Sequence, residues 1–321
     1  MLQDFLNQIL PSTVGGLVIG SIYALVALGY TMVYGVLRLI NFAHSEIFMI
    51  GTFASLVLLT AIAPAAPATF GIAMIGTLLL CMVVSAIASG GAAVLLETVA
   101  YRPLRKRGAT KLAALISAIG ASIFLQELFA LEIIPWLTDK PGRNQASAPR
   151  FVPRDELFHI GNAAVRLDHV IVIIAAVLVM IALDQTVSKT RIGRGIRATA
   201  QDPEAAVLMG VSIDNIVRVT FLLGGAMAGV AGALYLMEIE NTVFNVGFVL
   251  GIKAFTAAVL GGIGNLRGAL LGGIVLGLIE NWGAIFLGSQ WKDVIAFTVL
   301  VIVLMFRPTG ILGESLQRAR A

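Results

Sequence analysis

The sequence is poor in charged residues and has a single cysteine. Only 12% of its 321 residues are Asp, Glu, Lys or Arg, whereas 58% are hydrophobic. A soluble domain carries roughly 25% charged residues. Water therefore cannot be the solvent for most of the surface, which excludes a soluble globular protein. Cys81 lies in an apolar run without a partner for an intrachain disulfide, and it indicates only a small hydrophobe.

Sequence motifs of common catalytic and nucleotide sites are also absent. The chain has no G-x-x-x-x-G-K-[ST] phosphate loop, no H-E-x-x-H zinc pair and no Gly-x-Ser-x-Gly elbow. Its three histidines, His44, His159 and His169, are far apart in the sequence. We therefore expect no catalytic residue, no metal site and no cofactor bound by this chain.

Long apolar runs are abundant instead. Several exceed the roughly 18–20 residues that a helix needs to cross a hydrocarbon core about 30 Å thick. Lipid requires every backbone polar group to be paired within the segment, so the runs predict helices. The sequence predicts one all-α transmembrane domain over residues 1–321. The predicted spans are Ser12 to Leu28, His44 to Ala63, Phe70 to Leu96, Lys111 to Leu131, His169 to Leu183, Val217 to Met237, Val246 to Ile263, Ala269 to Leu287 and Val294 to Phe306.

The seventh run leaves the number of spans open between eight and nine. Gly247, Gly251 and Lys253 interrupt it, which indicates a broken or re-entrant helix. The stretch from Gly16 to Leu56 also has a rough counterpart from Thr220 to Leu260, and this predicts an inverted repeat. The 34 glycines predict close packing of the helices.

Basic residues predict the orientation, because cytoplasmic loops hold an excess of Lys and Arg. Basic clusters at 102–111 and 189–197 lie inside if the N-terminus is periplasmic and the C-terminus cytoplasmic. The first apolar run lacks a preceding Lys or Arg, so we expect a first span rather than a cleaved signal. Loop 184–216 is then cytoplasmic. Loop 132–168 is periplasmic and is either a docking surface or a solvated connector.

Two groups of polar residues in or near the spans are candidates for a substrate pathway. In the first group, Asn41, His44 and Glu46 form the polar lip of a broken helix, or Ser45 and Glu46 merely cap the second span. The second group pairs Lys253 with Glu280, either as a structural tie or as a substrate contact. Asn281 belongs to this group, and Asn245 is a further pathway candidate.

The cytoplasmic loop contains a short amphipathic helix. Asp202 is a suitable N-cap, Pro203 suits the first helical position and Gly210 ends the helix. Its apolar residues require either a protein groove or lipid headgroups. The candidate docking residues are Asp202, Pro203, Glu204, Ala205, Ala206, Val207, Met209 and Gly210.

The chain resembles the branched-chain amino acid permeases of the LivH family, membrane subunits of ATP-binding-cassette importers. The resemblance rests on Tyr23-Ala24-Leu25, Gly29 to Gly35, Ile40 to His44 with Glu46, Arg197-Ala198 with Ala205-Ala206 and Gly210, Gly251 to Glu280, Lys292-Asp293, and Arg307-Pro308-Thr309-Gly310 through Gly313. It implies a location in the bacterial inner membrane and transport of leucine, isoleucine and valine. It also implies a periplasmic binding protein, a second permease subunit, and two cytoplasmic ATPases that use ATP and press on the helix at Pro203.

Other functions stay open at this point. Related permeases carry urea, short amides or other amino acids. Glu46, Glu280 and the repeat are also compatible with an ion-coupled secondary transporter. An intramembrane enzyme using His44 and Glu46 is disfavoured, because residues two apart on a helix do not share a face.

Overall fold

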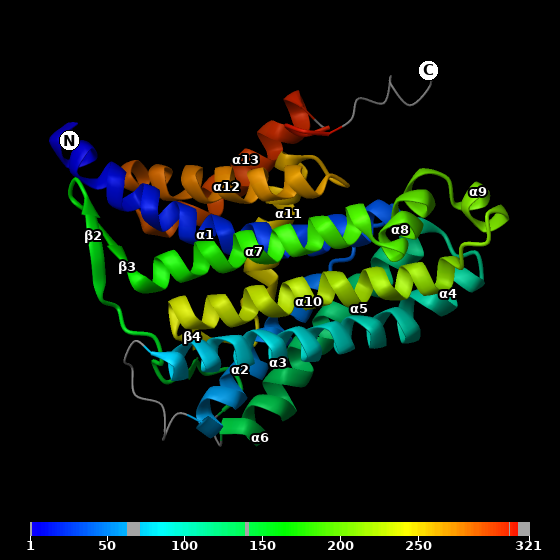
Figure 1. The fold of residues 1–321 in the computed structure, drawn as a ribbon, viewed down its shortest axis with the longest axis horizontal. Coiled ribbons are helices and arrows are strands. Elements are labelled where there is room, and N and C mark those ends of the chain that lie inside the picture. The colour runs from blue at the N-terminus through cyan, green and yellow to red at the C-terminus, as the bar shows by residue number, and fades with distance from the viewer. Residues whose placement is uncertain (1, 63–70, 139–140, 308, 314–321) are drawn as a thin grey trace.

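The protein is an elongated bundle of helices that run roughly along its longest axis (Figure 1). The computed structural model describes residues 2–62, 71–138, 141–307 and 309–313. Ala63 and Phe70, two predicted span ends, and Pro308 lie outside these ranges. The helices are α1 (Leu2–Leu37), α2 (His44–Ile62), α3 (Ile72–Leu96), α4 (Arg102–Lys106), α5 (Lys111–Leu128), α6 (Ile134–Thr138), α7 (Leu167–Lys189), α8 (Arg191–Gln201), α9 (Pro203–Leu208), α10 (Ile213–Ile239), α11 (Val246–Gly261), α12 (Leu266–Leu287) and α13 (Lys292–Phe306).

Eight helical segments in the described part of the chain are long and apolar enough to cross a membrane. Two of them are continuous through a π-helical turn: Glu97–Tyr101 joins α3 to α4, and Phe129–Ile133 joins α5 to α6. The predicted all-α membrane bundle is therefore confirmed. Most helices extend beyond the predicted spans, since hydropathy marks the apolar core of a helix rather than its polar ends; α1, for instance, runs from Leu2 to Leu37.

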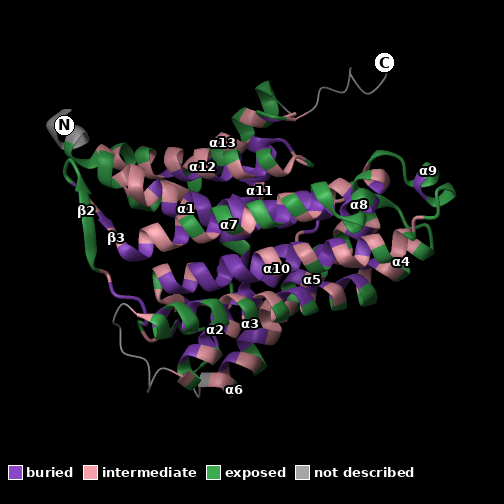
Figure 2. Ribbon diagram, in the orientation of Figure 1, coloured by how far each residue is buried: buried purple, intermediate pink, exposed green. Residues whose placement is uncertain are grey.

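Exposed residues lie mostly on the outer helices, whereas the central helices are largely buried (Figure 2). Ile87 on α3, Ile123 on α5, Leu178 on α7 and Met305 on α13 each expose more than half of their surface. A soluble monomer rarely presents apolar patches of that extent. These faces suit lipid or a partner subunit.

The helix α11 corrects one of the two forms predicted for the seventh run, the broken helix. Its 16 residues are a continuous helix, so the glycines and the lysine do not break it. Gly247 and Gly251 instead face Ser45 at the start of α2, where any side chain on either glycine would collide with Ser45. The break precedes α11, at residues 240–245, and α11 is shorter than the eight candidate spans.

Glycines bring two pairs of helices into close contact, α1 with α12 and α10 with α3. A methyl group at Gly20 would lie 2.9 Å from the carbonyl oxygen of Gly273 on α12. A methyl group at Gly225 would lie 2.8 Å from the carbonyl oxygen of Ser89 on α3. The first helix of each predicted repeat thus packs on the helix that follows the other repeat, and α1 and α10 run in opposite directions (Figure 1). This exchange of partners agrees with an inverted repeat.

The few strands lie at one end of the bundle, called here the hairpin end. The strands β2 (Glu156–Ile160) and β3 (Ala163–Arg166) form an antiparallel hairpin beside the start of α1 (Figure 1). The strand β1 (Ala146–Ser147) pairs with β4 (Asn241–Thr242), just after α10. Loop 132–168 is thereby attached to the segment that leads into α11. The helices α4, α8 and α9 lie at the opposite end, called the α9 end (Figure 1).

Candidate functional site

Two helix starts meet inside the bundle. The first is that of α2, where the chain resumes a helix after the break at residues 38–43, and the second is that of α11. Ser45 lies against the glycine face of α11, so the two starts are in direct contact. The first group of pathway candidates is on the α2 side of this contact, and the second group is on α11 and α12.

Glu46 is completely buried and joins α2 to α5. Its Oε1 accepts hydrogen bonds from Ser45 Oγ at 3.1 Å, Ser122 Oγ at 3.1 Å and Gln126 Nε2 at 2.9 Å. Its Oε2 has no hydrogen-bond partner among the described residues, and no Lys or Arg there forms an ion pair with it. Hydrogen bonds therefore satisfy one carboxyl oxygen, and the other is buried against Gly247 of α11.

The other two members of the first group are also buried. His44 packs edge-on against Tyr30, with the ring centroids 4.7 Å apart, and its imidazole occupies the space that Gly29 leaves on α1. Asn41 accepts a hydrogen bond from the Tyr101 hydroxyl through Oδ1 at 2.8 Å. These contacts hold the break between α1 and α2 in one shape.

The predicted pair between Lys253 and Glu280 is present. Lys253 Nζ lies 2.8 Å from Glu280 Oε1 and 2.6 Å from Asp293 Oδ1. The Tyr23 hydroxyl donates to Glu280 Oε2 at 2.9 Å. Both members of the pair are buried, whereas Asp293 is half exposed, so the lysine bridges a buried carboxylate on α12 and an accessible one on α13. Asn281 is not part of this group, because its Oδ1 accepts from Lys292 Nζ.

A cavity of about 250 Å³ lies on the lysine side of α11. Its wall includes Lys253, Tyr23 from α1, Tyr235 from α10 and Asn245, the residue before α11. Asn245 makes no side-chain cap to the helix, which leaves its amide free to face the cavity. Of the six pathway candidates, only Lys253 and Asn245 line this space, with Glu280 directly behind the lysine.

The helix α9 protrudes at the α9 end with an apolar tip. Asp202 caps it as predicted, with Oδ1 accepting from the backbone N–H groups of Glu204 and Ala205, and Gly210 ends it with a positive φ of 83°. Leu208 and Met209 are 87% and 84% exposed. The remaining predicted apolar residues differ: Val207 is half exposed, but Ala206 is buried and does not belong to the accessible surface. Pro203, Glu204, Val207, Leu208 and Ile213 line a hollow of about 400 Å³ there.

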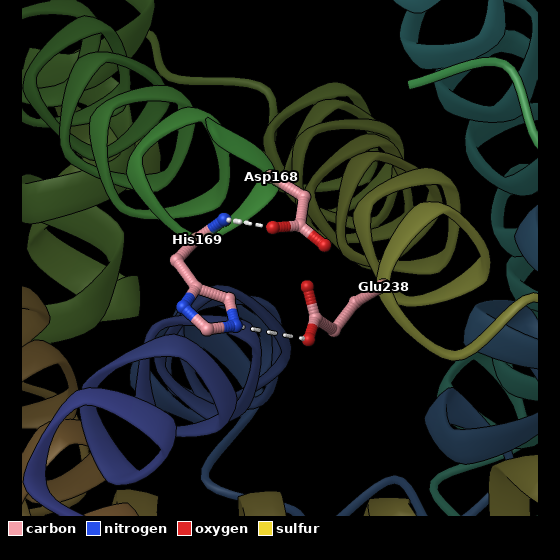
Figure 3. Close-up of side chains that lie close together, drawn as sticks. All are labelled: Asp168, His169 and Glu238. Carbon is pink, nitrogen blue, oxygen red and sulfur yellow. Dashed lines mark hydrogen bonds and ion pairs between the residues drawn. The ribbon is translucent and has the colours of Figure 1, made fainter. Parts of the chain in front are cut away.

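Asp168, His169 and Glu238 converge at the hairpin end in a geometry that a metal ion could use (Figure 3). Arginine side chains already occupy the carboxylates. Arg166 lies 2.7 Å from Asp168 Oδ2 and 3.3 Å from Glu238 Oε1, and Arg154 lies 3.6 Å from Asp168. Two guanidinium groups balance two carboxylates, so the cluster is better suited to tying the loop to α7 and α10 than to holding a cation.

A second tie at the hairpin end joins Arg150 to Glu240, which follows α10. Arg150 Nε donates to Glu240 Oε1 at 2.6 Å. This hydrogen bond lowers the pKa of the Glu240 carboxyl and raises the pKa of Arg150. Next to it, the Ala148 N–H donates to the Glu240 carbonyl at 2.8 Å. The loop therefore cannot move independently of the segment that enters α11.

Comparison with known proteins decides the family. A family model described as "Branched-chain amino acid transport system / permease component" matches residues 12–304. The chain belongs to this family. It is 41% identical to the high-affinity branched-chain amino acid transport system permease protein BraD of Pseudomonas aeruginosa, over 95% of this chain and 96% of BraD. It is 39% identical to LivH of Escherichia coli K12 over 98% of both chains. No solved structure matches it.

The resemblance noticed in the sequence is thus confirmed over nearly the whole permease. More distant members extend it: the probable branched-chain amino acid transport permease protein LivH of Methanocaldococcus jannaschii is 28% identical over 95% of this chain and 93% of its own length. The autoinducer 2 import system permease protein LsrC of Yersinia enterocolitica matches only 40% of this chain, at 34% identity. The long alignments are with permeases named for branched-chain amino acids.

Sequence reasoning missed several residues of this permease that contact the pathway candidates. Tyr23 and Asp293 complete the environment of Lys253, and Ser122 and Gln126 complete that of Glu46. Tyr23 and Asp293 lie in stretches that resemble the family, which was the one available signal. Ser122 and Gln126 gave none, because polar residues four apart on a span identify a face but not what it faces.

Proposed function

We propose that this chain is the membrane permease subunit of an ATP-driven importer of leucine, isoleucine and valine. Family membership supports transport, and the substrate is proposed from the names of the long-matching relatives. The single observation that supports ATP coupling is α9, a capped helix that presents Leu208 and Met209 outside the bundle. An exposed apolar helix tip needs a groove, and an ATPase subunit supplies one.

The proposed assembly contains two permease subunits, as a homodimer or with a homologous second permease, two ATPases that bind the ATP, and a periplasmic binding protein. The exposed apolar faces of the outer helices provide room for the second permease. We place the α9 end in the cytoplasm and the hairpin end in the periplasm of the inner membrane. Arg102, Arg105 and Lys106 on α4 and the basic residues of α8 gather at the α9 end, which supports this orientation.

The docking role is tested with Leu208→Glu in the complete assembly. The charge should abolish co-purification of the ATPases and ATP-dependent leucine uptake into proteoliposomes, while the permease still inserts. Leu157→Glu, an equally drastic change of an exposed leucine on β2 at the other end, should retain the ATPases. Full ATPase binding and uptake by Leu208→Glu would show that α9 is not the docking element.

The orientation is tested by cysteine labelling in a Cys81→Ser background. A cysteine at Val207 should react with a membrane-impermeant maleimide only when the cytoplasmic face is accessible, and a cysteine at Leu157 only from the periplasm. The reverse pattern would refute the proposed topology. Replacing Cys81 removes the native thiol as a source of background labelling. Because Cys81 is buried, the replacement leaves the protein surface unchanged.

One alternative keeps a specific observation in its favour. The unpartnered Oε2 of buried Glu46 is the kind of group that binds a proton or cation in an ion-coupled transporter. Leucine uptake by the purified chain alone, driven by a proton or sodium gradient, would establish that alternative. Competition by urea or short amides in the same assay would separate the substrate classes.

A further inference from the structure

The cavity beside α11 combines apolar and polar surface. Val246, Val249 and Leu250 provide the apolar part, and Tyr23, Tyr235 and Lys253 provide polar groups. Its volume of about 250 Å³ is below the roughly 300–1,000 Å³ of pockets for drug-sized ligands. The space therefore suits a small molecule with an aliphatic part and a charged part.

The Lys253 ammonium can still bind an anionic group. An ammonium has three N–H donors. Lys253 uses one toward Glu280 and one toward Asp293, so the third is available on the side that lines the cavity. The cavity also lies at the N-terminus of α11, where the helix dipole favours negative charge, and the uncapped Asn245 amide adds a donor.

The charge balance favours a zwitterion over a simple anion. Lys253, Glu280 and Asp293 together carry one excess negative charge, which repels a lone carboxylate. A ligand that carries an ammonium next to its carboxylate can place the carboxylate at Lys253, while its ammonium offsets the excess negative charge. An α-amino acid has both groups on adjacent atoms.

We propose that this cavity is the permease's binding site for the transported amino acid, with the carboxylate at Lys253 and the branched side chain against Val246, Val249 and Leu250. The inference rests on the proposed function and identifies where the substrate binds within the permease. The proposed site also distinguishes between the two groups of pathway candidates. The glycine face of α11 packs on Ser45 and separates this cavity from Glu46. On this proposal, Glu46 has a structural role and stabilises the packing of α2 on α5.

The test is substrate protection of a cysteine in the assembled transporter in nanodiscs. Val249→Cys, in a Cys81→Ser background, places a thiol on the cavity wall at a residue that is 40% exposed. Phe248→Cys is the matched control, since Phe248 is 51% exposed on the same helix but does not line the cavity. Maleimide modification of each peptide is followed by mass spectrometry with L-leucine, leucinamide or no addition.

Leucine should slow modification at position 249 about tenfold once its concentration is ten times its Kd, because modification then follows the unoccupied fraction. Position 248 should be unaffected. Leucinamide, which lacks the carboxylate, should protect far less. Equal rates at position 249 with and without leucine, or equal slowing at both positions, would overturn the site, and equal protection by leucinamide would overturn the carboxylate contact.

The same preparation separates this inference from the proposed function. ATP-dependent leucine uptake by the wild-type assembly without protection at position 249 would refute the proposed binding site but not the proposed importer function. Protection at position 249 without any ATP-dependent uptake would support the binding site and refute the proposed importer function.

Discussion

Lys253 Nζ lies 2.8 Å from Glu280 Oε1, and this buried ion pair fastens α11 to α12. Removing one partner of a buried pair costs about 3–5 kcal/mol, because the other charge is left uncompensated. The two partners are not equivalent here. Lys253 keeps Asp293 when Glu280 is neutralised, whereas Glu280 keeps only the Tyr23 hydroxyl when Lys253 is removed.

We therefore predict that Lys253→Met lowers the thermal unfolding temperature of the purified permease more than Glu280→Gln does. The double variant should recover part of the loss, because it removes both charges. Thermal unfolding in detergent, followed by size-exclusion chromatography, measures all three. An equal or larger loss in Glu280→Gln would mean that Asp293 does not stabilise the lysine.

How far the sequence predicts this structure depends on the range of each contact. The cap at Asp202 and the helix end at Gly210 were predictable because they are local, and the Lys253–Glu280 pair because a buried lysine needs a carboxylate. The role of Gly247 was not. A glycine that breaks a helix and one that admits a neighbouring backbone look the same in sequence, and only the contact with Ser45 distinguishes them.

A second prediction concerns the packing of α1 on α12. Alanine at Gly273 would place its methyl group 2.5 Å from the backbone of Ala24, which cannot move without shifting α1. We expect Gly273→Ala to lower the unfolding temperature or abolish folded expression. Alanine at Gly76 on α3 meets no atom of the described residues within 4 Å, so Gly76→Ala should be neutral or stabilise by up to about 1 kcal/mol. Similar behaviour of the two variants would contradict glycine-mediated packing at this interface.

A third prediction concerns pH at the hairpin end. Because Arg150 lowers the pKa of Glu240 in the folded protein, the tie contributes its full stability above the ordinary glutamate pKa of 4.5. That contribution is lost as the pH falls through the lowered value. As the pH falls through that lowered pKa, the Ala148 amide, which donates to the Glu240 carbonyl, should lose protection against hydrogen exchange, measured relative to the intrinsic rate at the same pH. Glu240→Gln should show fast exchange already at neutral pH and no further loosening from this group in acid.

The last prediction concerns Arg38, which lies at the end of α1 and bonds to the end of α8. Its guanidinium donates to the carbonyls of Ala200 at 3.1 Å and Gln201 at 3.4 Å, directly before the Asp202 cap of α9. The C-terminal carbonyls of a helix carry partial negative charge, so a cation there stabilises it by about 0.3–1 kcal/mol. Arg38 therefore links the segment directly before α9, the proposed docking helix, to α1, which also carries Tyr23 at the cavity.

We expect Arg38→Ala to leave ATPase binding intact but to raise the number of ATP molecules hydrolysed per leucine imported. Without the Arg38 contact, movement of α9 is no longer transmitted to α1. Both hydrogen bonds come from the same nitrogen, Nη2. Arg38→Lys should therefore be intermediate, because a lysine keeps the charge but its ammonium is more strongly hydrated and sits on a more flexible stem. Both variants are compared by measuring ATP hydrolysis and leucine uptake in the same proteoliposomes. A wild-type ratio in Arg38→Ala, with normal uptake, would show that the ATPase motion reaches the cavity by another route, for which α7 with α8 before α9 and α10 after it offer continuous connections.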